Sequence, residues 1–127
     1  SSLVGVLAQR LVRRLCPKCK EAYQIKRDDL LKIFPDLPLD EYPAEEFTLY
    51  KPKGCITCNN TGYKGREAVF EFLTVTEEMK ELILDRANAA AIKELAIKQG
   101  MHTLKDEGIY KVMHGKTSIE EILRVIV

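Results

Sequence analysis

Two short segments decide how this chain can fold: Cys16-Pro17-Lys18-Cys19 and Cys55-Ile56-Thr57-Cys58. They hold all four cysteines of the 127-residue sequence, and two residues separate the cysteines of each pair. Two thiolates at this spacing can face a single point when the turn between them is tight. Two such turns complete a tetrahedral shell of four sulfur atoms. We therefore predict that Cys16, Cys19, Cys55 and Cys58 bind one structural metal ion, zinc, with iron as the alternative.

The interval between the pairs is 35 residues, which is longer than the usual zinc-ribbon spacing. Closing a longer loop costs only about 0.6 kcal/mol per doubling of its length, against roughly 10 to 16 kcal/mol for structural zinc binding in small peptides. The competing interpretations are two disulfides, a redox pair or four unrelated buried thiols. Disulfides are unusual in a reducing compartment, and a redox motif leaves the second pair unexplained. A catalytic zinc is not expected, because four cysteine ligands leave no open position.

The residues around the cysteines alternate between strand-like and helix-like patterns. Residues 3–15 are rich in apolar side chains, and within them 10–15 fit a short half-buried strand or the end of a helix. The acidic start of 26–34 predicts a short helix. Prolines and acids predict a surface excursion over 36–46. Aromatic and β-branched residues predict strands over 47–50 and 67–73.

From Thr76 onward the apolar spacing is helical. Thr76, Asn88, Thr103 and Ser118 are expected to cap four short helices. In the last helix an apolar stripe follows the i, i+3, i+4, i+7 pattern at Ile119, Ile122, Leu123 and Ile126. We favour burial of this stripe within the chain over docking of a partner. The predicted fold is α+β: a small zinc-knuckle subdomain with short strands, followed by a C-terminal helical bundle.

The composition is that of a soluble globular domain, with 46% hydrophobic and 31% charged residues. The formal net charge of +1 gives no global attraction to nucleic acid or membrane. No apolar stretch approaches the roughly 20 residues that span a bilayer, and no signal peptide is recognisable, so we expect a cytoplasmic location. The sequence opens at Ser1 without methionine, from which we expect a fragment. It lacks Walker A, GxGxxG, HExxH and GxSxG motifs, so we expect no enzyme activity from the fragment alone.

A basic cluster flanks the first cysteine pair and favours a second possible function, the binding of nucleic acid. Its members are Arg10, Arg13, Arg14, Lys18 and Lys20. Zinc knuckles with basic flanks bind RNA and DNA, so the alternative function is a zinc-knuckle nucleic-acid-binding module. The sequence has no Trp, and its Tyr and Phe residues are scattered, which leaves few rings for base stacking. A solvated basic face is the simpler interpretation.

Several longer motifs carry a resemblance to one protein family. They are Gly5-Val6-Leu7-Ala8-Gln9-Arg10-Leu11-Val12-Arg13, the two cysteine segments with Thr61-Gly62-Tyr63-x-Gly65-Arg66, and Gly100-Met101-x-Thr103-Leu104, Asp106-x-Gly108 and Gly115-x-Thr117-Ser118-x-Glu120-Glu121. Over nearly its whole length the chain resembles the C-terminal portion of the hexameric ATPases that drive type II secretion and type IV pilus assembly.

The resemblance implies three parts: the end of a RecA-like ATPase core at 1–15, a four-cysteine zinc-binding subdomain at 16–75 and a C-terminal helical subdomain at 76–127. It implies that the Walker motifs, and with them ATP and Mg²⁺, belong to the upstream part of an ATP-hydrolysing parent. This region would then have a structural or coupling role. The implied partners are neighbouring ATPase subunits and an inner-membrane platform protein, with no nucleic acid, and the implied location is the cytoplasmic side of the bacterial inner membrane. Residue roles carry over only for the four cysteines, and the segment with Gln9, Arg10 and Arg13 is not assigned a nucleotide contact.

Overall fold

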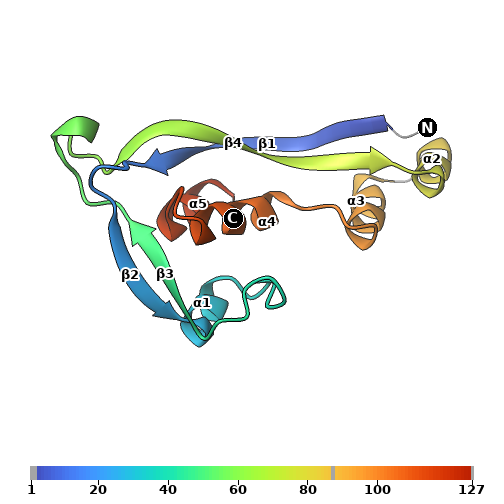
Figure 1. The fold of residues 1–127 in the computed structure, drawn as a ribbon. Helices are drawn as coiled ribbons and strands as arrows, with labels where there is room; N and C mark the ends of the chain where they lie inside the picture. The colour runs from blue at the N-terminus through green and yellow to red at the C-terminus, as the bar shows by residue number, and fades with distance from the viewer. Residues whose placement is uncertain (1–2, 87, 127) are drawn as a thin grey trace.

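The computed structural model describes residues 3–86 and 88–126 and has the predicted α+β composition. Two antiparallel hairpins form its β part. Strand β1 (Leu3–Leu15) pairs with β4 (Tyr63–Val75), and β2 (Glu21–Lys26) pairs with β3 (Glu46–Lys51). The β2–β3 hairpin is nested in sequence between the two strands of the other, so both connections between the hairpins run through the same corner of the molecule (Figure 1).

The ambiguous N-terminal segment is a strand along its whole described length. Its partners on β4 run from Val75, opposite Leu3, to Tyr63, opposite Leu15. Irregularities in the register lie between Val6 and Ala8 and between Arg13 and Leu15. The predicted strand at 67–73 is the middle of its partner β4, which therefore begins and ends several residues beyond the prediction.

The tip of the inner hairpin carries helix α1 (Arg27–Ile33), as predicted from its acidic first turn. Leu30 and Phe34 are fully buried. The segment 36–46 was expected to run over the surface. It does so only in part, because Leu37 is 4% exposed and joins the same core. The inner hairpin is therefore anchored to the rest of the chain by its tip as well as by its base.

The four predicted helix caps are confirmed. The helices are α2 (Glu77–Leu84), α3 (Ala89–Lys98), α4 (Leu104–Met113) and α5 (Ile119–Val125). The side chains of Thr76, Asn88, Thr103 and Ser118 each accept a hydrogen bond from a main-chain amide three residues later. Such bonds satisfy amides that have no partner within the helix, which fixes where each helix begins.

The helices pack as two pairs against different parts of the β1–β4 hairpin (Figure 1). Helices α4 and α5 cover the main core, whose buried members are Val12, Leu30, Phe34, Leu37, Leu49, Val69, Ile109, Val112 and Ile122. Helices α2 and α3 enclose a smaller cluster of Leu73, Val75, Met79 and Ala96 near the end of β4. In the predicted stripe of α5, Ile122 is fully buried but Leu123 is 41% exposed, so the buried face is narrower than its spacing indicated. None of the helices in the described ranges has the length and apolarity needed to cross a membrane.

Candidate metal centre

The nested hairpins bring the two cysteine pairs together. Cys16 and Cys19 lie on the connection from β1 to β2, and Cys55 and Cys58 lie on the connection from β3 to β4. All four Sγ atoms lie within 4.8 Å of one another. Cys16 and Cys58 are buried, and Cys19 and Cys55 are half-buried. Convergence of two turns distant in sequence was the central prediction, and the structure places the sulfur atoms as that prediction requires.

The distances between the sulfur atoms fit a tetrahedral ion. The Sγ atoms of Cys16 and Cys55, of Cys19 and Cys58, and of Cys55 and Cys58 are each 3.8 Å apart. A regular tetrahedron with Zn–S bonds of about 2.3 Å has edges of about 3.8 Å. A disulfide requires sulfur atoms about 2.05 Å apart, and all four cysteines are free thiols. The donor set of four soft sulfur atoms suits zinc, or iron as the alternative.

Main-chain amides point at the sulfur atoms. The amide of Gly54 donates to Cys19 Sγ at 3.3 Å, and that of Gly62 donates to Cys58 Sγ at 3.2 Å. The amide of Cys55 also donates to Cys58 Sγ, at 3.3 Å. Hydrogen bonds of this kind stabilise thiolates, which are the form that binds metal.

Burial and hydrogen bonding shift the thiol pKa values in opposite directions. Burial alone would raise the pKa of Cys58, but the amides of Cys55 and Gly62 and the neighbouring thiols outweigh it and lower the pKa to about 6. The main-chain amide of Cys58 lowers the pKa of Cys55. Burial raises the pKa of Cys19 to about 11. A cation bound by all four sulfurs would favour the thiolate at each position and release the remaining protons.

The turn after Cys58 depends on backbone conformations that favour glycine. Gly62 has φ +83°, and a Cβ built on it would lie 2.4 Å from Cβ of Pro52. Gly65 has φ +80°, so both glycines adopt the positive φ angles predicted for them. The close approach of Gly62 to Pro52 holds the second knuckle against the end of β3.

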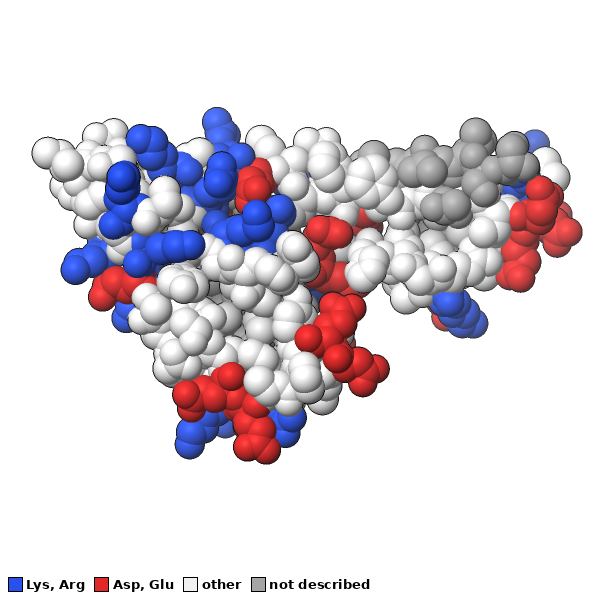
Figure 2. Space-filling view, in the orientation of Figure 1, with Lys and Arg blue, Asp and Glu red and all other residues white. Residues whose placement is uncertain are grey.

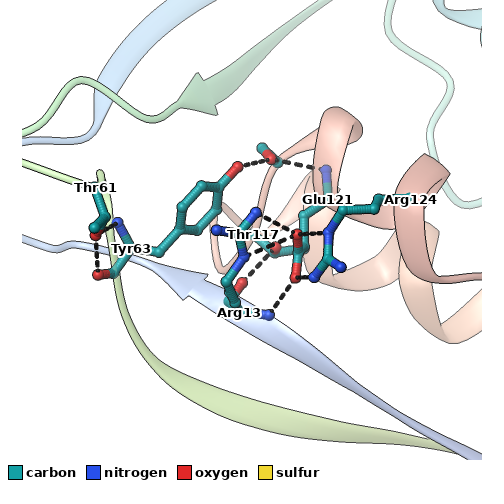
Figure 3. Close-up of polar contacts among 7 residues, drawn as sticks. Arg13, Thr61, Tyr63, Thr117, Glu121 and Arg124 are labelled. Carbon is teal, nitrogen blue, oxygen red and sulfur yellow. Dashed lines mark hydrogen bonds and ion pairs between the residues drawn. The ribbon is translucent and has the colours of Figure 1, made fainter.

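A polar cluster beside the metal centre ties α5 to the end of β1 (Figure 3). The carboxylate of Glu121 is fully buried and accepts hydrogen bonds from the Arg13 amide at 2.8 Å and from Arg13 Nε and Nη2 at 3.1 and 2.9 Å. Arg124 donates to the same carboxylate from Nε at 3.0 Å and Nη2 at 2.9 Å. Burial alone would raise the pKa of Glu121, but the hydrogen bonds from Arg124 and Arg13 lower it to about 2.

Three more hydrogen bonds complete this connection. Thr117 Oγ1 donates to the Arg13 carbonyl at 2.7 Å, and the hydroxyls of Tyr63 and Ser118 lie 2.7 Å apart. The amide of Leu15, next to Cys16, donates to the Lys116 carbonyl at 2.9 Å. The segment 115–121 therefore fixes the strand end from which the first cysteine pair begins. The sequence contains both halves of this cluster, but nothing in their spacing indicates that they meet.

The basic cluster predicted beside the cysteines divides in the structure. Arg13 is neutralised by Glu121, and Lys20 donates to the Gly115 carbonyl at 3.0 Å. Arg10 donates to the carbonyl of its neighbour Gln9. Arg14 and Lys18 are exposed, and neither side chain has a hydrogen-bond or ion-pair partner among the described residues. Lysine and arginine side chains gather at this end of the molecule, and acidic side chains gather over the other parts (Figure 2).

Comparison with known proteins agrees with the motifs and with the four-cysteine geometry. The sequence profile described as "Type II/IV secretion system protein" matches residues 1–124. The type IV pilus assembly ATPase PilB of Thermus thermophilus is 43% identical over 123 residues, which is 97% of this chain and 13% of that protein. The type II secretion system ATPase E of Vibrio cholerae is 43% identical over 125 residues, 98% of this chain and 24% of that protein. The chain thus spans at most about a quarter of the length of these relatives. A profile match over nearly all of the sequence, together with these identities, shows that the chain belongs to the type II/IV secretion system protein family.

Proposed function

We propose that Cys16, Cys19, Cys55 and Cys58 bind one structural zinc ion. The observation that carries this proposal is the convergence of the four Sγ atoms within 4.8 Å, with three Sγ–Sγ distances of 3.8 Å that equal the edge expected for a zinc tetrahedron. Four cysteine ligands leave no position for water or substrate, so the ion would contribute folding energy and rigidity rather than catalysis.

The chain itself is proposed to be the C-terminal region of a hexameric, cytoplasmic ATPase that powers type II protein secretion or type IV pilus assembly. The names of the relatives support both uses, since pilus assembly ATPases and a type II secretion ATPase match equally well. On this proposal residues 1–15 end the RecA-like core, residues 16–75 are the zinc-binding subdomain and residues 76–127 are the helical subdomain. ATP and Mg²⁺ would bind to parts of the parent that lie outside this chain.

The proposed role of the region is to couple movement between the motor and its partners. The metal would lock the corner where the β1–β4 and β2–β3 hairpins meet, and α4 packs against both hairpins through Ile109 and Val112. A displacement of one hairpin would then be transmitted to the other instead of being absorbed at the corner. The partners on this proposal are neighbouring ATPase subunits and the inner-membrane platform protein of the machine.

Nucleic acid is not proposed as a partner. Aromatic rings near the basic end would have to be free to stack on bases. The ring of Tyr63 is covered by the Arg13 guanidinium at 4.1 Å, and that of Tyr50 by Lys20 Nζ at 4.6 Å. The rings nearest the metal centre therefore already have cationic partners within the chain.

The test uses the full-length motor with the substitution Cys55→Ser. Zinc measured by elemental analysis should fall from stoichiometric to absent, and secretion or piliation should be impaired while the protein remains expressed. Thr57→Ser is the matched control, because Thr57 is exposed in the same knuckle and supplies no ligand atom. Zinc retained by Cys55→Ser would reject the metal assignment, whereas full secretion or piliation without zinc would reject the coupling role alone.

A further inference from the structure

A pocket whose charged lining residues are all basic lies at the corner of the molecule, separate from the Glu121 cluster. It has a volume of about 370 Å³, and its charged lining residues are Arg14, Lys20, Lys64 and Lys116. No carboxylate lines it. We propose that this pocket binds a phosphate group of a small molecule or a lipid headgroup.

The fold creates the pocket through an irregularity in the long hairpin. Arg13 pairs with Arg66 and Leu15 pairs with Tyr63, so β4 has one residue more than β1 across this interval. The extra residue of such a bulge disrupts the ladder and redirects side chains. Arg14 consequently lies opposite both Lys64 and Gly65. A Cβ built on Gly65 would find only Arg14 Cδ within 4 Å, at 3.8 Å, so the absence of a side chain at this position leaves the pocket open.

The connection before α5 supplies the opposite wall. The Lys116 carbonyl accepts from the Leu15 amide at 2.9 Å, which fixes Lys116 beside the end of β1. Lys20 reaches the same wall, where its Nζ donates to the Gly115 carbonyl at 3.0 Å. Three elements distant in sequence therefore present cations to one cavity.

These cations differ from the arginines on the neighbouring face. Arg13 and Arg124 share the Glu121 carboxylate, which offsets their charge. The side chains of Arg14, Lys64 and Lys116 have no hydrogen-bond or ion-pair partner within the part of the chain that the structure describes. Like charges around one cavity, with no carboxylate among its lining residues, repel one another, so a bound anion would relieve this repulsion.

Phosphate fits this pocket better than the carboxylates of an acidic peptide. Four positive groups around one small cavity match a compact anion of charge about −1 to −2 with several acceptor oxygens, and lysine is a regular ligand of phosphate. The cavity also lies within the size range of sites that hold small molecules. An acidic peptide would spread its charges over a longer path than this cavity offers.

The test is a titration of the isotopically labelled protein with sodium phosphate at low chloride, followed by amide resonances. Saturable shifts are expected at Gly65, Gly115 and Lys116, and they should weaken as salt is added. Lys64→Gln/Lys116→Gln should weaken binding at least about tenfold, because two charge-assisted contacts are lost. Lys26→Gln/Lys98→Gln lowers the net charge equally at exposed positions outside the pocket and should bind like the parent.

Vesicles distinguish the two sources of phosphate. Co-sedimentation with vesicles of phosphatidylglycerol in phosphatidylcholine, but not with phosphatidylcholine alone, would assign the site to a headgroup if Lys64→Gln/Lys116→Gln abolishes it. Saturable phosphate binding without vesicle binding would assign it to a soluble phosphate compound. The proposal is overturned if phosphate gives no saturable shifts, if both double variants lose binding equally, or if an oligoglutamate peptide shifts these amides and phosphate does not.

Discussion

The buried carboxylate of Glu121 holds both the main chain and the side chain of Arg13, a residue 108 positions earlier in the sequence. One oxygen accepts from the Arg13 amide, and the other accepts from its guanidinium. The acid thus binds the main chain of β1 and neutralises the arginine in the same contact. Because α5 and β1 meet here, the cluster connects the last helix to the strand that leads into the metal centre.

Glu121→Gln should lower the free energy of unfolding by about 3 kcal/mol, the scale expected when one partner of a buried ion pair is removed. The side-chain amide of the glutamine could still accept a hydrogen bond through its oxygen. Its NH₂ group, however, would face another of the donors from Arg13 and Arg124. Urea denaturation monitored by circular dichroism measures the difference. Glu120→Gln is the matched control, since Glu120 is exposed and should change stability by less than about 0.5 kcal/mol. Equal effects of the two substitutions would show that the cluster does not stabilise the fold.

The stabilisation by Glu121 should also depend on pH. Its pKa is lowered from 4.5 to about 2 in the folded chain, so the unfolded chain takes up the proton first as the pH falls. The stability advantage of the parent over Glu121→Gln should be complete above the unfolded pKa and should shrink between about pH 4.5 and pH 2. Denaturation of both proteins across this range, with the metal state matched, tests the sign. A difference that stays constant down to pH 2 would contradict the lowered pKa.

Removing the metal should loosen the corner between the hairpins more than the distant helices. With a chelator present, the melting temperature should fall by at least about 10 °C, since structural zinc contributes several kcal/mol to folding. Amide exchange should accelerate first at the cysteine turns and the adjoining ends of β2 and β3. Helices α2 and α3 pack in a separate cluster, so their exchange should change least. Uniform acceleration throughout the chain would show that the clusters unfold together.

Gly62→Ala should lower the free energy of unfolding far more than Gly100→Ala. Both glycines have positive φ, +83° and +95°, so both substitutions carry a backbone cost of about 1 kcal/mol. At Gly62 the new Cβ would also meet Pro52 Cβ at 2.4 Å, whereas at Gly100 nothing lies within 4 Å. We expect Gly62→Ala to cost at least about 2 kcal/mol more and to weaken metal binding, measured by denaturation and by competition with a chelator. Comparable losses at the two positions would show that the turn adapts without strain.

The features that the sequence predicted best are those written in local patterns. The cysteine spacing predicted that four sulfurs converge, and single polar residues such as Thr103 and Ser118 predicted where helices begin. Residues 10–15 remained ambiguous because apolar and basic residues are mixed there in a way that fits either element. The pairing with β4 resolves that ambiguity, but it joins residues that lie far apart in the chain.

The features that escaped prediction depend on long-range packing. Glu121 was recognisable only as part of a motif, because nothing near it indicates that Arg13 is its partner. Leu123 follows the apolar spacing of α5 but is exposed, since the helix presents Ile122 to the core and turns Leu123 away. The division of the four helices into two pairs follows from which part of β4 each pair meets, and apolar periodicity carries no information on that choice.

The nesting of the β2–β3 hairpin between β1 and β4 determines how its length and sequence can change. The polypeptide enters and leaves the inner hairpin through neighbouring cysteine turns, so its two ends are held together whatever lies between them. The tip of the inner hairpin can gain residues, lose residues or change in sequence without shifting the register of β1 against β4. The condition is that Leu30, Phe34 and Leu49 stay in one core with Ile109. The inner hairpin can therefore differ between members of the family while the β1–β4 hairpin that carries it keeps its pairing.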